Sequence, residues 1–426
     1  MSTYETISVV GLGYIGLPTA TAFALRGKRV IGVDASQHVV DTINRGEIHI
    51  TEPDLDSAVQ QVVEAHHFHA STKPMEADAF LIAVPTPFKG EDHEADLRYI
   101  EAVAKAIAPV LRTGTLVVLE STAPVGATEQ MAAWLASARP DLSFPQNAGE
   151  ASDIRIAYCP ERVLPGQVMR ELVENDRVIG GMTPLCSKRA VDLYRIFVAG
   201  ECVVTNVRTA EMAKLTENSF RDVNIAFANE LSMICEKLDI DVWELIALAN
   251  RHPRVNILQP GAGVGGHCIA VDPWFIVSRT PDEARLIRTA REVNDQKPEW
   301  VLSKIRESVG AFLMSNTDMK VDEVILACYG LAFKPDIDDL RESPALDIVK
   351  RLCSEHPGPV LAVEPNLEVL PASLQQVTLV PFEEGAAAHI HILLVDHRQF
   401  REANAPEGWV IDVKGLWEPE FRKLPV

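Results

Sequence analysis

The sequence predicts an α/β protein in which two doubly wound parallel sheets are joined by a central segment of long helix. Apolar strand-like runs alternate with helix-like runs from residue 7 to about residue 205, which is typical of a parallel sheet. A helical run without glycine or proline follows from Thr209, and a second series of strands and helices begins after residue 323. We therefore expect three sections, at residues 1–205, 206–310 and 311–426.

The first section opens with a glycine turn typical of a dinucleotide-binding Rossmann fold. A strand at residues 7–10 runs into GLGYIG, which places Gly11, Gly13 and Gly16 before an apolar helix. The next strand, RVIGVD, ends at Asp34, where an acid can accept hydrogen bonds from an adenosine ribose and repel a 2′-phosphate. The pattern favours NAD over NADP, with the pyrophosphate at the helix N-terminus. The alternative is a plain tight turn in an α/β domain.

Further strands and helices extend this first sheet. Strands are expected at residues 79–87, 115–122, 154–161, 177–181 and 201–205, with helices at about 96–111 and 125–138. Thr86 and Thr122 come just past two strand ends, at the edge where parallel sheets bind ligands. Their hydroxyls could face the nicotinamide, although isolated threonines of this kind are more often loop caps.

The helical run from Thr209 is too long for an ordinary surface helix. We interpret it as a central helix that joins two α/β halves and pairs with its copy in a second subunit. Its apolar residues recur at helical spacing; they are Met212, Leu215, Val223, Phe227, Leu231 and Ile234. Lys214 and Asn218 lie four residues apart on an offset face and are therefore neighbours. They form either a solvated polar face or part of a catalytic site.

The segment GAGVGGHCIAVDP, at residues 261–273, is the most informative part of the chain. Four glycines lead to Cys268, and they let the backbone approach a ligand closely. Asp272 and Pro273 match the cap and first position of a helix. Cys268 is either a nucleophile aimed at a bound substrate or a small buried thiol in a structural turn.

The third section is predicted to form a second, smaller doubly wound sheet. Its first loop carries Lys334 and Arg341, and a helix starts at Ser343 and Pro344. Two cations beside a helix N-terminus suit phosphate or carboxylate groups, although scattered surface cations are the simpler interpretation.

Composition restricts the partners of the chain. A formal net charge of −20 disfavours nucleic acid and anionic membrane surfaces, both of which require a basic footprint. The 7 cysteines contain no CxxC pair, so neither a disulfide framework nor a zinc site is suggested, and no metal is expected. No signal peptide or bilayer-length apolar run is evident, which favours a reduced, cytoplasmic protein.

Seven segments in order make the chain similar to the UDP-glucose/UDP-mannuronic acid dehydrogenase family over its whole length. They are GLGYIGLP, VPTP, ESTAPVG, CPER, AKLTENSFRDVNIAFANE, GVGGHCIAVDP and GLAFKPDIDDLRESPA. Within the family, CPERVLPGQ, NRHPRVNILQPG and GGHC resemble most the members that act on UDP-N-acetyl-D-mannosamine. Typical UDP-glucose enzymes have glutamate in place of Pro165 and serine in place of His267, which argues against UDP-glucose as the substrate.

The resemblance implies oxidation of a sugar C6 alcohol to a carboxylate with two NAD⁺, for a cell-surface polysaccharide such as enterobacterial common antigen. Cys268 would carry a thioester, with Lys214 and Asn218 stabilising an oxyanion and Asp272, with Glu161, directing water. Implied substrate contacts are Arg162, Val163, Lys214, Asn218, Arg221, His252, Arg254, Gly265 and Lys334. Implied cofactor contacts are Gly11, Gly13, Tyr14, Ile15, Gly16, Asp34, Thr86, Thr122 and Arg341. A homodimer is implied because the region around Arg254 reaches the neighbouring subunit in the family.

Several alternatives stay open at this point. A β-hydroxyacid dehydrogenase would also place Lys and Asn four residues apart after a dinucleotide domain, but it needs neither Cys268 nor the third section. A non-catalytic nucleotide-binding protein would use the folds alone. Residue spacing does not separate N-acetylmannosamine from N-acetylglucosamine or glucose. His267 either assists the thiol or is a turn residue bonded to backbone.

Overall fold

The computed structural model describes residues 4–50, 52–90, 92–163, 166–266 and 268–417. The chain divides into two compact units. The first comprises Met1–Glu217 with Trp274–Arg279, and the second comprises Asn218–Pro273 with Thr280–Val426. The three predicted sections, with boundaries at residues 205 and 310, stay a prediction.

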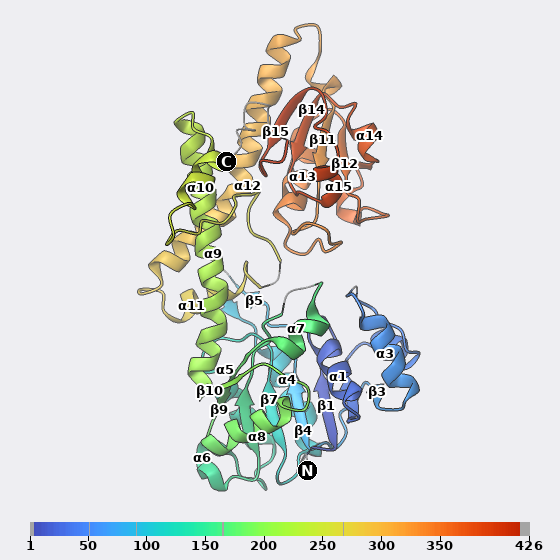
Figure 1. Ribbon diagram of the computed structural model, residues 1–426, viewed down its shortest axis with the longest axis vertical. Helices are drawn as coiled ribbons and strands as arrows, with labels where there is room; N and C mark the ends of the chain where they lie inside the picture. Colours follow the sequence, from blue (N-terminus) through green and yellow to red (C-terminus); the bar gives the residue numbers. More distant parts are fainter. Residues whose placement is uncertain (1–3, 51, 91, 164–165, 267, 418–426) are drawn as a thin grey trace. The chain divides into compact units, whose positions relative to one another are not determined.

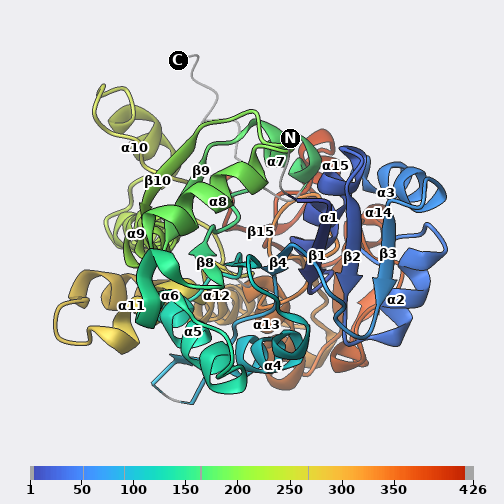
Figure 2. The same cartoon turned by 90° about the horizontal axis from the view of Figure 1, so that it is seen from below.

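The first unit is built on an eight-stranded sheet in the order β10-β9-β8-β7-β4-β1-β2-β3 (Figure 2). Its strands are β1 Thr6–Val10, β2 Arg29–Val33, β3 Phe68–Ser71, β4 Ala79–Ile82, β7 Leu116–Leu119, β8 Arg155–Tyr158, β9 Arg177–Gly181 and β10 Cys202–Asn206. Its helices are α1 Gly16–Leu25, α2 Gln37–Asn44, α3 Leu55–Glu64, α4 Arg98–Ile107, α5 Ala127–Ala138, α6 Pro145–Ala148, α7 Val168–Glu174 and α8 Pro184–Tyr194, with 3₁₀ turns η1 Ala108–Val110 and η2 Gly149–Ala151.

Helices cover both faces of this sheet, which confirms the predicted doubly wound fold. Successive strand residues point to opposite faces, so Leu81 belongs to the core cluster that includes side chains of α1, α3 and α8. Its neighbours Phe80 and Ile82 belong to the cluster on the other face, which includes side chains of α4 and α5. Strands buried on both faces are continuous apolar runs, which is why the sequence pattern identified them.

The sheet is not parallel throughout, because β8 and β9 pair antiparallel while β9 and β10 are parallel. In the described part of the connection from Tyr158 to Arg177, the short helix α7 is the only helix. The buried ion pair between Glu161 and Arg177 shows that the chain re-enters the sheet at the edge where β8 ended. Strand β9 therefore begins beside the residues that follow β8 and runs antiparallel to β8.

The strand predicted at residues 79–87 is shorter in the structure and ends at Ile82. Pro85 and Pro87 follow and cannot donate to a ladder. A hairpin that the sequence analysis did not predict comes next, formed by β5 Phe88–Lys89 and β6 Glu94–Ala95. The hairpin's His93 stacks on Trp274 at a centroid distance of 4.3 Å.

The second unit contains a parallel five-stranded sheet in the order β13-β12-β11-β14-β15, drawn in orange and red in Figure 1. Its strands are β11 Leu326–Tyr329, β12 Val360–Val363, β13 Thr378–Leu379, β14 Ile390–Leu393 and β15 Trp409–Asp412. The 3₁₀ turn η3 Val321–Glu323 precedes β11, and the elements between the strands are α13 Pro344–Glu355, η4 Ala372–Leu374, α14 Phe382–Gly385 and α15 Arg398–Glu402. The second, smaller sheet was predicted correctly.

Among the described residues, four α-helices lie between the two sheets in sequence. They are α9 Val207–Lys237, α10 Val242–Ala249, α11 Asp272–Arg279 and α12 Arg285–Ser315. Helix α9 is 31 residues long and begins two residues before the predicted Thr209. Within the described residues, no helix combines the length and apolar character that crossing a bilayer requires.

The apolar stripe of α9 does not pack as an ordinary core face. Leu215 is fully buried, but Phe227 is 49% exposed and Ile234 is 46% exposed. The buried face of the same stretch is polar and includes Asp222 and Asn229, both with no exposed surface. Helical periodicity identifies an apolar face, but it does not say whether the same chain covers that face.

Candidate active site

The glycine turn between β1 and α1 has the geometry of a pyrophosphate cradle. Gly11 has φ of 90°, and a Cβ there would lie 2.3 Å from the carbonyl oxygen of Ala83. A Cβ on Gly16 would lie 1.7 Å from the carbonyl oxygen of Gly11, so the third glycine lets the helix pack against the turn. Apart from the two chain neighbours of Gly13, no described residue comes within 4 Å of the position that a Cβ on Gly13 would take. A ligand therefore has room against this part of the backbone.

Asp34 lies beside this turn, as the sequence predicted. One carboxylate oxygen accepts a hydrogen bond from the Leu12 amide at 3.0 Å, and the other accepts one from the Ser36 amide at 2.9 Å. Both bonds fix the carboxylate at the end of β2, next to the glycines, where a ribose hydroxyl would donate to it. Tyr14 and Ile15 are half-buried in the turn.

The two predicted threonines are linked to each other. The hydroxyl of Thr86 donates to the carbonyl oxygen of Thr122 at 2.5 Å, which joins the loops that follow β4 and β7. This bond is the capping role that the sequence analysis gave as the alternative for Thr86. It leaves the hydroxyl oxygen able to accept one further hydrogen bond.

Glu161 belongs to a buried cluster that includes residues the sequence analysis missed. One oxygen pairs with Arg177 at 2.6 Å, and the other accepts from the amide of Arg162 at 2.6 Å. Glu120 lies in the same cluster and accepts from the hydroxyl of Tyr194 at 2.6 Å. The guanidinium of Arg177 thus bonds one acid, Glu161, and its charge also acts on the other, Glu120.

The electrostatics of this cluster follow from burial. Removal from water raises the pKa of Glu120 from 4.5 to about 7, and the nearby charge of Glu161 adds to the increase. Burial likewise raises the pKa of the Cys159 thiol to about 12, so this cysteine is inert as a nucleophile. Glu120 therefore carries a proton below neutral pH, whereas Arg177 compensates the charge of Glu161.

The loop after Glu161 is held on both sides. Arg162 forms an ion pair with Glu217 at 2.8 Å. Glu52, which the sequence analysis did not identify, accepts hydrogen bonds from the amides of Gly166 at 2.9 Å and Val168 at 2.8 Å. Val163 is half-buried, and Pro165 lies outside the described residues.

Asn218 and Asp272 meet in the structure although they are distant in sequence. The side-chain amide of Asn218 on α9 donates to the buried carboxylate of Asp272. Helix α11 begins at Asp272 itself, so the acid lies in the first helical turn instead of the predicted cap position. Lys214 is half-buried one turn before Asn218 and belongs to the first compact unit. Its predicted pairing with Cys268 stays a prediction.

Cys268 is half-buried in a turn that leads into α11. Its carbonyl oxygen accepts hydrogen bonds from the amides of Val271 at 3.1 Å and Asp272 at 2.8 Å. The glycines before it pack tightly, since a Cβ on Gly265 would lie 2.4 Å from the carbonyl oxygen of Glu342. The backbone of this loop thus docks against the segment that precedes α13. His267 lies outside the described residues.

The predicted substrate cations lie on several elements. Arg221 is exposed on α9, and His252 and Arg254 are exposed on the loop after α10. Lys334 is half-buried in the loop after β11. Since these four residues come from separate segments of the second unit, their convergence on one substrate stays a prediction. Arg341, predicted as a cofactor contact, makes a two-pronged ion pair with Asp339 at 2.6 Å, so it could reach a ligand only with its remaining donors.

The helix start predicted in the third section is confirmed. Helix α13 begins at Pro344, and the hydroxyl of Ser343 accepts a hydrogen bond from the amide of Leu346 at 3.3 Å. The same hydroxyl donates to the carbonyl oxygen of Leu331 at 2.6 Å. Ser343 therefore ties the helix N-terminus to the loop that carries Lys334.

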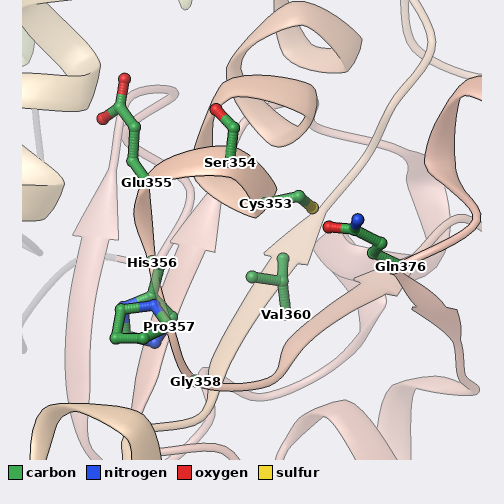
Figure 3. A pocket seen from close by; sticks show the side chains of 8 residues that line it. All are labelled: Cys353, Ser354, Glu355, His356, Pro357, Gly358, Val360 and Gln376. Atoms are coloured by element: carbon green, nitrogen blue, oxygen red, sulfur yellow. The ribbon is translucent and has the colours of Figure 1, made fainter.

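A cavity of about 390 Å³ lies elsewhere in the second unit, at the amino end of β12 (Figure 3). Its lining includes Cys353, Glu355 and His356, whose side chains point in different directions in Figure 3. The His356 ring already bonds the carbonyl oxygen of Val324 at 2.7 Å. None of the predicted site residues that the structure describes lines this cavity. Across the described ranges, no three His, Cys, Asp or Glu side chains group closely enough to hold a metal ion.

Comparison with known proteins gives three consecutive matches to one family. The descriptions are UDP-glucose/GDP-mannose dehydrogenase family, NAD binding domain at residues 5–198, central domain at residues 208–296, and UDP binding domain at residues 327–419.

Individual relatives match over the whole length. A UDP-N-acetyl-D-mannosamine dehydrogenase from Yersinia pestis is 66% identical over 423 residues, which cover 97% of this chain and 100% of the relative. An NDP-N-acetyl-D-galactosaminuronic acid dehydrogenase from Ralstonia nicotianae is 62% identical over 418 residues, covering 97% of this chain and 96% of the relative. Among solved structures, a UDP-D-ManNAc dehydrogenase from Pyrococcus horikoshii superimposes with a TM-score of 0.86 at 37% identity, over 97% of this chain and 96% of that one.

Proposed function

Because the chain belongs to the UDP-glucose/GDP-mannose dehydrogenase family and is thereby an NAD-dependent nucleotide-sugar dehydrogenase, we propose that it oxidises UDP-N-acetyl-D-mannosamine. The product is UDP-N-acetyl-D-mannosaminuronic acid, formed at C6 with two NAD⁺ reduced. The observation that carries this proposal is the glycine loop, which presents Cys268 one turn before Asp272, with Asp272 bonded to Asn218 on α9.

The first unit supplies the residues that fit NAD. The turn leaves open space at Gly13 for a pyrophosphate, and Asp34 is fixed beside it for the adenosine ribose. When bound, NAD⁺ accepts a hydride from the sugar carbon. The carboxylate of Asp34 also disfavours NADP, because it would repel a 2′-phosphate.

The first oxidation removes a hydride from C6 and a proton from its hydroxyl, which leaves an aldehyde. We assign the proton to a water held near Lys214 and Asp272. The thiolate of Cys268 then adds to the aldehyde carbon and forms a C–S bond. The resulting thiohemiacetal can release a second hydride, and its product is a thioester.

The groups around Cys268 have separate tasks in the second oxidation. Lys214 and Asn218 stabilise the negative charge that develops on the sugar oxygen. Asp272 directs a water to the thioester carbon, with Glu161 as its partner. Water then replaces the C–S bond by a C–O bond, which yields the carboxylate and returns the thiol.

The choice of sugar rests on the relatives. The Yersinia pestis relative carries the mannosamine name, and the Ralstonia relative is nearly as similar under a galactosaminuronic acid name. UDP-N-acetylglucosamine and UDP-glucose are the alternatives for the same chemistry. The uronic acid product would serve a cell-surface polysaccharide such as enterobacterial common antigen. Lys334, which lies in the region that matches the UDP binding domain, is assigned to the nucleotide half of the substrate, and Arg341 is assigned to the cofactor.

We further propose a homodimer through α9. The exposed side chains Phe220, Phe227 and Ile234 follow one another along this helix at spacings of seven residues, so they lie on one face. An apolar stripe of this length costs free energy in water and marks an interface. A second copy of the same helix is the partner that we assign to this stripe, because a two-fold interface pairs the same patch of both subunits.

The test is an assay of the purified protein with NAD⁺ and three sugars, which are UDP-N-acetylmannosamine, UDP-N-acetylglucosamine and UDP-glucose. We expect the kcat/KM for UDP-N-acetylmannosamine to be at least about tenfold above the values for the other two sugars. This ratio corresponds to a difference of about 1.4 kcal/mol in transition-state binding free energy. Equal or greater turnover of another sugar would refute the substrate assignment. Binding of NADH without turnover on any sugar would refute the enzymatic proposal.

A further inference from the structure

The surface between α9 and α12 is unusual because it is filled by polar side chains. Asp222 and Asn229 on α9 and Arg291 and Asn294 on α12 are at most 1% exposed. Burying such groups costs free energy unless each is hydrogen-bonded, and apolar residues would join two helices at lower cost. Their presence suggests a task beyond holding the helices together.

The four side chains form one continuous network. Asn294 donates to the carboxylate of Asp222 at 2.8 Å, and Arg291 donates to the same carboxylate oxygen at 2.5 Å. Asn229 donates to the side-chain oxygen of Asn294 at 2.8 Å. These bonds join Asp222 on α9 to the two residues on α12, and Asn294 on α12 to Asn229 on α9. Each side chain therefore restrains the rotamer of the side chain that it bonds.

Both ends of this network bond the backbone of the Cys268 loop. The side-chain oxygen of Asn229 accepts a hydrogen bond from the amide of Gly261 at 2.9 Å, at the start of the loop. Arg291 donates to the carbonyl oxygen of Ile269 at 3.5 Å, in the residue directly after Cys268. All of these contacts lie within the second compact unit.

The loop needs such restraint because of its composition. Its four glycines leave the backbone many accessible conformations, and ordering each residue costs about 1–2 kcal/mol of entropy. A nucleophile must nevertheless be held close to its attack geometry, since a displacement of about 1 Å can slow a reaction about a hundredfold. Fixed bonds before and after Cys268 reduce the positions that its sulfur can occupy.

We propose that Asp222, Asn229, Arg291 and Asn294 form a positioning network that places Cys268 for attack on the aldehyde. The inference rests on the proposed function, because it assigns the network to the second of the two oxidations. None of the four touches the reacting atoms, so they act through the loop backbone. The network bonds the loop at Gly261 and Ile269, whereas Asn218 holds the carboxylate of Asp272, so the first hydride transfer, which does not use the thiol, does not require the network.

The same helix pair offers a matched control. The ammonium group of Lys297 on α12 donates to the hydroxyl of Ser232 on α9 at 2.5 Å and lies 3.5 Å from the centre of the Trp300 ring. Lys297 is as buried as the network residues, at 1% exposed. Its partners belong to the helices and not to the loop, so Lys297→Met perturbs the interface without releasing the backbone around Cys268.

The experiment compares Asn229→Ala and Arg291→Lys with Lys297→Met in the full-length protein. Rapid mixing with excess NAD⁺ and limiting UDP-N-acetylmannosamine follows NADH formation. In the two network variants we expect the first equivalent at the wild-type rate and the second slowed about ten- to hundredfold. Lys297→Met is expected to form both equivalents at the wild-type rates. The KM for NAD⁺ is expected to be unchanged in all three.

A second readout does not depend on turnover. Alkylation of Cys268 by iodoacetamide, measured by peptide mass spectrometry, is expected to be at least about threefold faster in the network variants, because a released loop exposes its half-buried thiol more often. Wild-type rates in both assays for Asn229→Ala and Arg291→Lys would overturn the inference. The inference would also fail if Lys297→Met slowed the second NADH as much as the network variants do at the same loss of melting temperature. The network would then have a structural role only.

The two measurements, NADH formation and alkylation of Cys268, also distinguish a failure of this inference from a failure of the proposed function. If the wild-type protein forms only one NADH per sugar, the thioester scheme fails, and the alkylation rates alone decide whether the network fixes Cys268. If the wild type forms two and the variants differ from it only in alkylation, the thioester scheme stands and the catalytic need for the network is refuted.

Discussion

Replacing Glu120 by glutamine is expected to remove a pH dependence from the stability of the first unit. Glu120 is 2% exposed, and burial raises its pKa from 4.5 to about 7. The folded protein therefore holds a proton that the unfolded chain releases above pH 4.5. Between pH 4.5 and 7 the folded state binds more protons, so the free energy of unfolding decreases as pH increases, and the decrease ends above the folded pKa.

The magnitude follows from the difference between the two pKa values. A shift of about 2.5 units at 1.36 kcal/mol per unit gives a loss of about 3 kcal/mol between pH 4 and pH 8. Glutamine has nearly the shape of the protonated acid and can still accept the hydrogen bond from Tyr194. It does not titrate, so Glu120→Gln removes this contribution and preserves the packing.

The assay is urea denaturation of wild type and variant at pH 5, 6, 7 and 8. We expect the wild type to lose about 2.5 kcal/mol more than Glu120→Gln from pH 5 to pH 8, because part of the full loss falls between pH 4 and pH 5. Glu64→Gln, at an exposed position on α3, controls for the removal of a carboxylate. Stability curves of wild type and Glu120→Gln that run parallel from pH 5 to 8 would show that the carboxyl group titrates normally and would refute the reasoning.

Two further changes test the cofactor turn and the proposed dimer. Gly13→Ala is expected to leave the melting temperature unchanged and to weaken NAD binding at least about tenfold, measured by calorimetry, because a methyl group there fits beside the described residues but occupies ligand space. Gly16→Ala is expected to lower the melting temperature instead, since its Cβ would lie 1.7 Å from the carbonyl oxygen of Gly11, and unchanged stability would contradict the packing argument. Phe227→Glu is expected to convert a dimer into a monomer in sedimentation experiments, because it places a charge on the exposed apolar face of α9. A wild-type protein that sediments as a monomer would refute the dimer.

Local patterns account for what the sequence predicted well. The glycine turn is one example, since the positive φ of Gly11 and the close approach of Gly16 are demands that only glycine meets. The start of α13 is another, because a serine cap followed by proline acts within one helical turn. The length of α9 was predictable because neither glycine nor proline interrupts it.

Contacts between distant residues account for what the sequence did not predict. Arg177 reaches Glu161 because β9 runs antiparallel, a reversal that no local pattern encodes. Glu52 bonds the amide of Gly166, which lies 114 residues further along the chain. Asn229 bonds Gly261 across the loop that contains α10. A short-range pattern carries no information about such pairs.

The exposed and buried faces of α9 show a different limit. The periodicity of Phe227 and Ile234 was recognised, but a core face and an interface face have the same spacing. The polar residues on the buried side, such as Asp222, would be assigned to the solvent by pattern alone. The positions of Arg291 and Asn294 on α12 explain why a carboxylate can be buried there.

The central claim is that the thiol of Cys268 holds the sugar through a second oxidation. The most direct measurement is the amount of NADH formed per UDP-N-acetylmannosamine consumed, in wild type and in Cys268→Ala. We expect the wild type to form two NADH per sugar with the acid as product, and the variant to form no acid while still binding NAD. One NADH per sugar in the wild type, or acid formation at the wild-type rate by Cys268→Ala, would contradict it.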